Sequence, residues 1–291
     1  MKKRVITIII TAALILTACS SNGNERSRSK SDRDDDENGE VEQINTPTSE
    51  PANTPTPIPE VYSIDGDYII FGHYEQDGDI SNGSEPIEWE IVREEDGRML
   101  LISRYILDAQ PYNTESTAIT WETCSLRAWL NDDFINAAFD ASEQARILTV
   151  TNSNPDNALW GIEGGNDTED RVFCLSVEEV LDNYEFGKWD EEHQNGFSQS
   201  LMTEVTQYAI DNGVKNHEIT STDYYSALES CGFTDDCIGL TCGSWWFRSP
   251  GDRKFFACYV FCYNGRAGWG WHTEVNLNEI GVRPALYLSV D

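Results

Sequence analysis

The sequence predicts an α+β fold in which antiparallel sheets are flanked by helices. This prediction rests on the order of patterns within residues 61–291: strand-like segments come first, helix-like segments follow, and strand-like segments return at the end. The stretch is long enough for one large domain, and all nine tryptophans of the chain fall in it, which provides bulk for a sizeable core. We therefore expect a single α+β domain over 61–291.

The first strands are expected at 67–74, 87–92 and 98–103, because these segments are rich in β-branched and aromatic residues and are separated by turn residues. The second and third are connected through Glu-Glu-Asp-Gly at 94–97. An Asp-Gly pair tolerates the positive φ angles of a tight turn, so the sequence predicts a hairpin here.

The middle of the domain carries several helix signals. The spacing of one apolar helix face recurs at Leu126, Trp129, Leu130 and Phe134. A second short helix is expected from Asp140, where Glu143 can complete a cap, and the capping-box pattern at 176–179 predicts another. A further helix is expected over 200–212, ended by Asn212 and Gly213.

The last strands are expected at 245–249, 255–263 and 282–290. Because side chains alternate along a strand, Trp245 and Trp246 should point to opposite faces and pack against different layers.

Two arginines within these C-terminal segments, Arg248 and Arg283, are interpreted as structural. A half-buried guanidinium has five donors in a rigid fork, which suits loop carbonyls or a carboxylate. The Pro250-Gly251 pair should end its strand, and Pro284 should lie where no ladder donor is needed.

The first 18 residues predict a signal peptide, with a basic start and an apolar run too short to span a bilayer comfortably. Leu-Thr-Ala-Cys at 16–19 resembles a bacterial lipobox, which implies acylation of Cys19 and an extracytoplasmic protein anchored to the cell membrane by lipid alone. Residues 19–60 are rich in Pro, Thr and Asp and predict a disordered stalk.

A net charge of −31 argues against nucleic acid as a partner. The four histidines, His73, His193, His217 and His272, are scattered without zinc spacing, so no metal site or cofactor is expected from them. The acidic segment 166–170 offers oxygen ligands for calcium, and the alternative interpretation is a solvated acidic turn. No nucleophile with an identifiable base is evident, and the chain is not expected to be an enzyme.

Seven cysteines remain if Cys19 is acylated, and a local disulfide among Cys231, Cys237 and Cys242 is plausible from their proximity. Cys258 and Cys262 are four apart on one expected strand, which separates them by about 13 Å, so they should not bond to each other.

The spaced motifs Trp-Trp-x-Arg-Ser-Pro-Gly at 245–251 and Gly-Val-Arg-Pro-Ala-Leu at 281–286 resemble a family of uncharacterised bacterial surface domains. The segments 87–92, 100–103 and 120–131 support the resemblance. Those domains are similar to the C-type-lectin-like fold of formylglycine-generating enzymes and of retroelement variable proteins, so the resemblance implies that fold for 61–291.

The glycine-rich segment 263–279 lies between the two motifs, in a region that carries ligand contacts in lectin-like variable proteins. We expect it to be exposed and to bind a glycan, a peptide or a cell-wall component. The candidate ligand-binding residues are Tyr263, Asn264, Arg266, Trp269, Trp271 and His272. The alternative for Trp269 and Trp271 is that they fill the core.

Two other functions stay open. Formylglycine-generating enzymes use a C-terminal cysteine pair with copper, and Cys258 and Cys262 lie in a similar region, although with three residues between them instead of four. The alternative for these thiols is a structural role on a buried strand. The domain could also be a purely structural surface module.

Overall fold

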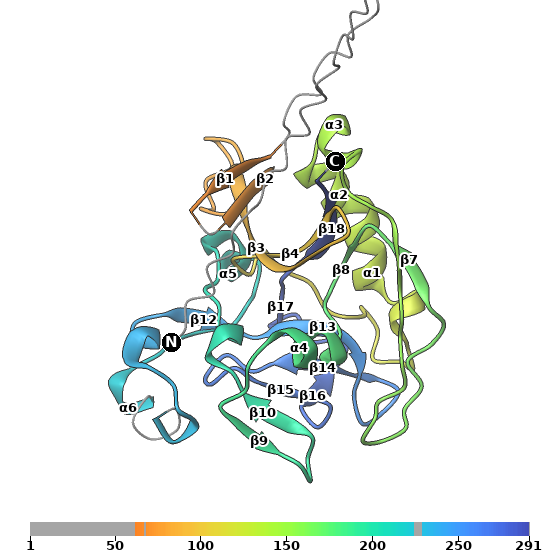
Figure 1. The fold of residues 1–291 in the computed structure, drawn as a ribbon, viewed down its shortest axis with the longest axis vertical. Coiled ribbons are helices and arrows are strands. Elements are labelled where there is room, and N and C mark those ends of the chain that lie inside the picture. Colours follow the sequence, from red (N-terminus) through yellow and green to blue (C-terminus); the bar gives the residue numbers. More distant parts are fainter. Residues whose placement is uncertain (1–61, 67, 224–228, 291) are drawn as a thin grey trace, which may run out of the picture. The chain divides into compact units, whose positions relative to one another are not determined.

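The computed structural model describes residues 62–66, 68–223 and 229–290, all within one compact unit (Figure 1). The expected signal peptide, the candidate lipid-attachment residue Cys19 and the expected stalk lie outside the described residues. None of the helices in the described part of the chain has the length and apolar character that a membrane span requires.

The largest sheet has six strands, all antiparallel to their neighbours. In sheet order they are β1 (Ser63–Asp65), β2 (Tyr68–Tyr74), β3 (Glu85–Glu95), β4 (Arg98–Ser103), β18 (Ala285–Ser289) and β8 (Val172–Phe173). The β3–β4 hairpin confirms the predicted turn, because Asp96 and Gly97 both adopt positive φ, +44° and +75°. The last strand of the chain is therefore inserted beside a hairpin formed near the start of the domain.

A second sheet of five strands lies below the first in Figure 1. In sheet order it contains β16 (His272–Glu274), β14 (Phe256–Val260), β13 (Trp245–Pro250), β17 (Gly281–Val282) and β5 (Asp108–Ala109). Only the β13–β17 pair is parallel. Both C-terminal motifs thus contribute strands to the centre of this sheet, and the chain crosses to the six-stranded sheet between β17 and β18.

Smaller sheets cover the ends of these two. One contains β15 (Arg266–Gly268), β10 (Asn195–Phe197) and β9 (Lys188–Asp190). Two others are pairs, formed by β11 (Asn216–Glu218) with β12 (Thr241–Gly243) and by β6 (Val150–Asn152) with β7 (Thr168–Asp170).

The helices are short. They are α1 (Ser125–Trp129), α2 (Ile135–Ala138), α3 (Ala141–Gln144), α4 (Val177–Asn183), α5 (Gln207–Asp211) and α6 (Ser221–Asp223), with one π-helical turn at Leu130–Phe134 joining α1 to α2. The capping boxes predicted at Asp140 and at Ser176 are both confirmed, at the starts of α3 and α4. The antiparallel α+β class predicted from the sequence is therefore confirmed.

The helix expected over 200–212 is wrong in its first half. Thr206 caps α5 by accepting the backbone N–H of Ala209, so the helix begins only at Gln207. Before it, Gln199–Leu201 form a 3-10 turn, and Glu204 and Val205 form bridges with Cys242 and Ile106 instead of a helix.

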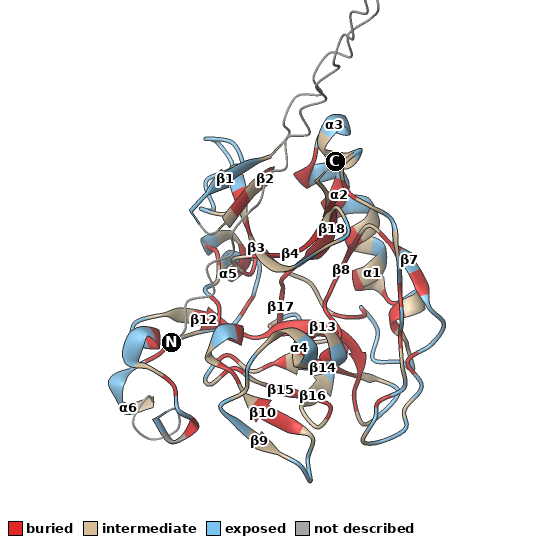
Figure 2. Ribbon diagram, in the orientation of Figure 1, coloured by how far each residue is buried: buried red, intermediate tan, exposed pale blue. Residues whose placement is uncertain are grey.

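The core lies between the two large sheets and under α1 and α2 (Figure 2). Trp245 and Trp246 are fully buried and have different neighbours, as their alternation predicts. Trp245 packs against Phe247 and donates its Nε1–H to Leu201, whereas Trp246 packs against Tyr112 and Tyr259. The two indoles thereby pack β13 against the residues on both sides of its sheet.

Candidate functional site

Aromatic side chains gather on one face of β14 and of the residues that follow it. Tyr259, Phe261 and Tyr263 alternate with buried residues and are in ring contact, with centroid distances of 6.5 Å between the first two and 4.8 Å between the last two. Because side chains alternate across a strand, this spacing places all three rings on the same side.

Trp271 extends this row of rings sideways. Its centroid lies 5.4 Å from that of Phe261 and 6.1 Å from that of Tyr259. The Arg266 guanidinium lies over the indole, 4.2 Å from its centroid, and its Nε donates to the Asn195 Oδ1 at 2.9 Å. Strand β10 therefore holds Arg266 in place, and Arg266 in turn supports the indole.

A groove of about 380 Å³ runs along these rings, and we call it the aromatic groove. Tyr259, Phe261 and Tyr263 line it together with Val214, Lys215, Asn216, Ser244, Cys262, Thr273, Leu277, Glu279 and Ile280. The only charged lining residues are Lys215 and Glu279, which form an ion pair. The groove thus combines an apolar, aromatic wall with a polar rim that carries no net charge.

One lining residue, Tyr263, packs its ring against His217 at a centroid distance of 4.0 Å. His217 lies 3.2 Å from Asp223, measured from Nε2 to Oδ2. Asp223 also accepts hydrogen bonds from the Thr220 hydroxyl and amide, and these bonds hold the pKa of its carboxyl at about 2. Tyr263 itself remains 41% exposed, which leaves its ring available to a ligand.

The structure brings only part of the predicted ligand-binding set to this place. Tyr263 lines the aromatic groove. Trp271 packs against Phe261, another lining residue, and Arg266 packs over the Trp271 ring. Asn264 accepts the backbone N–H of Arg266 and so stabilises the turn between them.

The expectation that Trp269 is exposed is wrong. Its side chain is 3% exposed and belongs to the main core, and its carbonyl oxygen accepts a hydrogen bond from the side chain of Asn157. His272 lies elsewhere, against Phe256 and with its Nδ1 3.4 Å from the Asp252 carboxylate. Burial lowers the pKa of His272.

Tyr259 and Phe261 were not among the candidates, although the sequence holds a signal for them. In Tyr-Val-Phe-Cys-Tyr at 259–263 every second residue is aromatic, which is the pattern of a strand with one aromatic face.

Arg248 and Arg283 lie in the interior. Arg248 donates through Nη1 to the Cys174 carbonyl oxygen and to Glu179. Arg283 is fully buried, donates through Nε to the Ser103 carbonyl oxygen at 2.7 Å, and lies over the Trp245 ring. Both guanidiniums connect distant segments.

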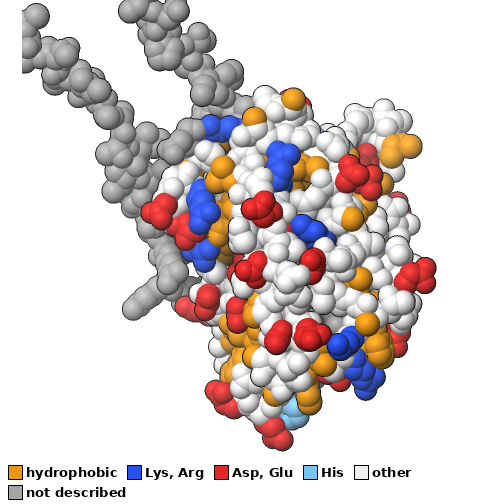
Figure 3. Space-filling view, turned by 90° about the vertical axis from the view of Figure 1, so that its right-hand side faces the viewer, with side chains coloured by type: hydrophobic (Ala, Val, Ile, Leu, Met, Phe, Trp, Pro, Cys, Tyr) orange, Lys and Arg blue, Asp and Glu red, His pale blue; other side chains and the backbone are white. Residues whose placement is uncertain are grey.

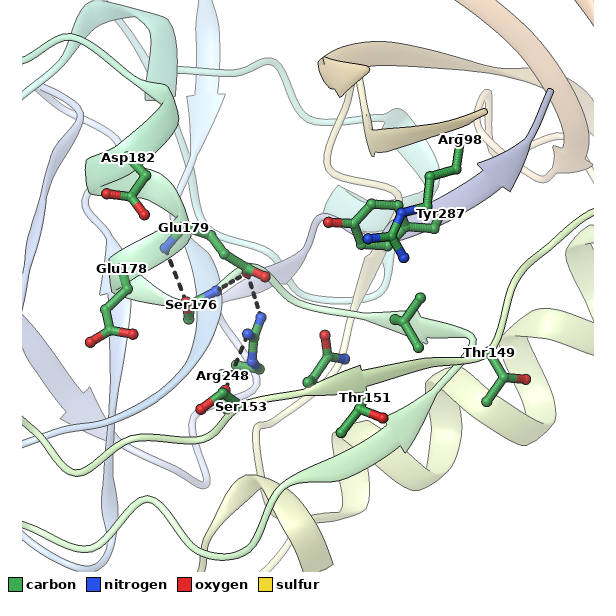
Figure 4. A pocket seen from close by; sticks show the side chains of 12 residues that line it. Arg98, Thr149, Thr151, Ser153, Ser176, Glu178, Glu179, Asp182, Arg248 and Tyr287 are labelled. Carbon is green, nitrogen blue, oxygen red and sulfur yellow. Dashed lines mark hydrogen bonds and ion pairs between the residues drawn. The ribbon is translucent and has the colours of Figure 1, made fainter. Parts of the chain in front are cut away.

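Arg248 also forms the floor of a second cavity, of about 380 Å³, shown in Figure 4. Helix α4 forms one wall, with Glu178, Glu179 and Asp182, and Arg98 stacks over Tyr287 on the opposite wall. Its floor is occupied by the Arg248–Glu179 pair, so this cavity has a strongly polar lining, unlike the aromatic groove.

In the acidic segment 166–170, which was considered for calcium, Asp170 has a structural role. Asp170 is buried and accepts hydrogen bonds from four side chains, those of Trp121, Arg127, Asn152 and Thr168. Within the described ranges, the one grouping of carboxylates close enough to share an ion is Glu75, Asp77 and Glu85, and it includes no residue of 166–170.

The cysteines considered for copper chemistry lie in different environments. Cys258 belongs to the main core, with its Sγ 3.2 Å from the Pro250 carbonyl oxygen, and burial raises the pKa of its thiol. Cys262 belongs to a smaller apolar cluster. Cys237 and Cys242 are free thiols, so the local disulfide expected among Cys231, Cys237 and Cys242 is not formed.

The fold and the site define a predominantly antiparallel α+β domain with an aromatic groove beside its C-terminal strands. Residues 96–290 match the family described as "Domain of unknown function (DUF6273)", and the chain belongs to this family. The matched region begins at the turn of the β3–β4 hairpin and includes every residue that lines the aromatic groove. No curated protein and no solved structure matches the chain.

Proposed function

We propose that this chain is an exported, lipid-anchored protein of the cell surface whose domain binds a neutral glycan in the aromatic groove. The observation that carries the proposal is the row of Tyr259, Phe261 and Tyr263 rings along a groove with a polar rim that has no net charge.

A sugar ring has an apolar face of C–H groups and an edge of hydroxyls. Aromatic rings in a groove can cover such a face and remove its apolar area from water. The side chains of Asn216, Ser244 and Thr273 line the same groove and offer hydrogen-bond partners for hydroxyls. The two kinds of lining group therefore match the two kinds of sugar surface.

Charge favours a neutral ligand. The chain carries −31, and Figure 3 shows acidic side chains spread over one face of the domain with Lys and Arg interspersed. An anionic polymer would be repelled by this field, and the Lys215–Glu279 pair leaves no uncompensated cation in the groove.

The location belongs to the same proposal. It is supported by the signal-like start, the Leu-Thr-Ala-Cys sequence ending at Cys19 and the proline-rich segment before the domain. The C-type-lectin-like fold is supported by the two C-terminal motifs and by the antiparallel sheets that contain them. We assign the groove a binding role and no chemical step.

The test is a glycan array probed with the full chain in detergent, followed by titration of each binding glycan while tryptophan fluorescence is recorded. Tyr263→Ala should weaken binding about ten- to hundredfold, because it removes the apolar contact of one large side chain, worth about 1.5–3 kcal/mol. The matched control is Trp160→Ala, which removes another exposed aromatic side chain outside the groove and should leave affinity unchanged.

Proline-rich peptides should be assayed in parallel, because aromatic grooves also bind polyproline II helices. Binding of such peptides without binding of any glycan would replace the glycan by a peptide ligand. Equal affinity of wild type and Tyr263→Ala for every glycan bound would remove the groove from the proposal.

A further inference from the structure

Four cysteines of the domain meet in one place. Cys231, Cys237, Cys242 and Cys262 form a small apolar cluster with Met202, Ile219 and Phe233, apart from the main core that holds Cys124, Cys174 and Cys258. The region lies directly beneath the aromatic groove, because Cys262 is one of the groove's lining residues.

Within this cluster, Cys242 and Cys262 are in direct contact. The Cys242 thiol donates a hydrogen bond to the Cys262 carbonyl oxygen, with Sγ 2.9 Å from that oxygen. Strand register explains the contact. Trp245 pairs with Val260, so the residues just before β13 lie beside those just after β14, and the Cys262 N–H donates to Ser244 Oγ.

We propose that Cys242 and Cys262 are a modification site, at which a disulfide bond forms and fixes the floor of the aromatic groove. The two residues are 20 positions apart in the chain, so the bond would close a loop that contains β13, β14 and the turn between them.

The two thiols differ in a way that suits stepwise oxidation. The neighbouring Cys242 thiol lowers the pKa of Cys262, whereas the Cys262 side chain, together with burial, raises the pKa of Cys242. Cys262 is also the one at the groove surface, being 5% exposed where Cys242 is fully buried. Cys262 is therefore the thiolate that an incoming oxidant meets first.

The oxidant is a disulfide, either a small molecule or the active site of a thiol–disulfide oxidoreductase. The Cys262 thiolate attacks one sulfur of that disulfide, a mixed disulfide forms, and the other sulfur leaves as a thiolate that takes up a proton. The Cys242 thiol then loses its proton and attacks the Cys262 sulfur. The oxidant's second sulfur leaves as a thiol, so two protein thiols are oxidised and one disulfide is reduced to two thiols.

The consequence for ligand binding rests on the proposed function. Cys262 directly precedes Tyr263, the exposed ring among the groove's lining residues. A bond from Cys262 to β12 restrains the backbone at this ring, so the oxidised form should hold the groove in its binding geometry with less conformational freedom to lose.

The primary test detects the bond itself and is independent of any ligand. The full chain is reduced, exposed to oxidised glutathione, alkylated and digested, and the peptides are analysed by mass spectrometry. The expected result is one cross-linked peptide pair joining Cys242 to Cys262, with Cys124, Cys174 and Cys258 alkylated. Complete alkylation of Cys242 and Cys262 after oxidation, or pairing of either with another cysteine, would overturn the proposal.

A second measurement compares melting temperatures. Oxidation should raise the Tm of the wild type by about 5–10 °C, because the bond restrains a loop in the unfolded chain. Cys242→Ser should show no such rise, whereas Cys258→Ala, a matched change on β14 in the main core, should retain it. An equal rise in Cys242→Ser would assign the effect to other thiols and contradict the proposal. Loss of glycan binding with the bond intact would instead refute only the proposed function.

Discussion

The guanidinium of Arg248, which is 4% exposed, and the carboxylate of Glu179, which is 20% exposed, form a largely buried pair with Nη1 2.5 Å from Oε2. Glu179 simultaneously accepts the backbone N–H of Ser176 and so completes the capping box of α4. One carboxylate thus ties the C-terminal motif in β13 to a helix some seventy residues earlier in the chain.

This pair should be a large single contribution to stability. Glu179→Gln leaves the Arg248 charge, only 4% exposed, without its counterion, and removal of one partner from a buried pair costs about 3–5 kcal/mol. The measurement is urea denaturation followed by circular dichroism. Glu178→Gln, at the exposed neighbouring position of α4, is the control and should change stability by less than about 0.5 kcal/mol. Similar losses in the two variants would contradict the structural role of the pair.

Replacing two aromatic residues of the segment 263–279 should lower stability by very different amounts. Trp269→Ala deletes a core side chain and should lower the free energy of unfolding by about 3–5 kcal/mol. Tyr263→Ala affects a side chain that is 41% exposed and should cost about 1 kcal/mol or less. Thermal and urea unfolding of both variants provide the comparison. If Trp269→Ala unfolded like the wild type, its position in the core would be wrong.

Asp170 should be required for folding with or without calcium. Asp170→Asn presents an amide group to four donors and leaves Arg127 without a charged partner, which should cost about 3 kcal/mol. Unfolding is measured in excess calcium and in excess chelator, and the loss should be the same in both. A calcium-dependent rise in Tm that occurs in the wild type and is absent from Asp170→Asn would instead establish a metal site at 166–170.

Gly265 should not tolerate a side chain. Its φ is +58°, and a Cβ at this position would lie 1.9 Å from the Ser198 carbonyl oxygen, so Gly265→Ala requires the backbone to move. Gly239→Ala is the matched control, since Gly239 also has positive φ but open space around it. We expect about 1 kcal/mol of destabilisation in the control and clearly more in Gly265→Ala, by urea denaturation. Equal costs would show that the contact with Ser198 does not matter.

The segment around Asp223 should show a defined pH dependence. Because the folded state holds this pKa at about 2, below the usual value of 3.8, the ionised carboxylate stabilises the fold. The contribution is complete above about pH 4 and disappears as the pH falls through the folded pKa. Urea midpoints of wild type and Asp223→Asn should differ at pH 6, and the difference should shrink as the pH is lowered from about 4 towards 2. A difference that stays constant over this range would mean that ionisation of Asp223 is not its source.

Local signals predicted the fold well where the chain's own neighbours decide the structure. The Asp96-Gly97 turn and the caps at Asp140 and Ser176 each depend on residues within four positions, and all three are present. The start of α5 was mispredicted because Glu204 and Val205 pair with strands far away in sequence. Pairing between residues distant in the sequence cannot be predicted from the hydrophobic pattern of either segment.

In the candidate site too, the sequence predicts what neighbouring residues decide and misses what distant residues decide. The alternation at 259–263 identifies one aromatic face of a strand, and sequence alone could have added Tyr259 and Phe261 to Tyr263. The burial of Trp269 could not be predicted in this way, since the glycines on either side of it, Gly268 and Gly270, lie against the backbone of residues 193–195, which are distant in the sequence. Glycines beside a tryptophan can mark an exposed turn or a close approach of two backbones, and only the second occurs here.

The position of β18 has a consequence for biosynthesis. This strand is made about 180 residues after β4, yet it pairs with β4 on one side and with β8 on the other. Until β18 has been made, the nascent hairpin of β3 and β4 therefore carries an unpaired edge that is open to pairing with other chains. A chain truncated before Ala285 would keep the β4 edge unpaired. Premature termination should therefore yield aggregates instead of a smaller folded domain.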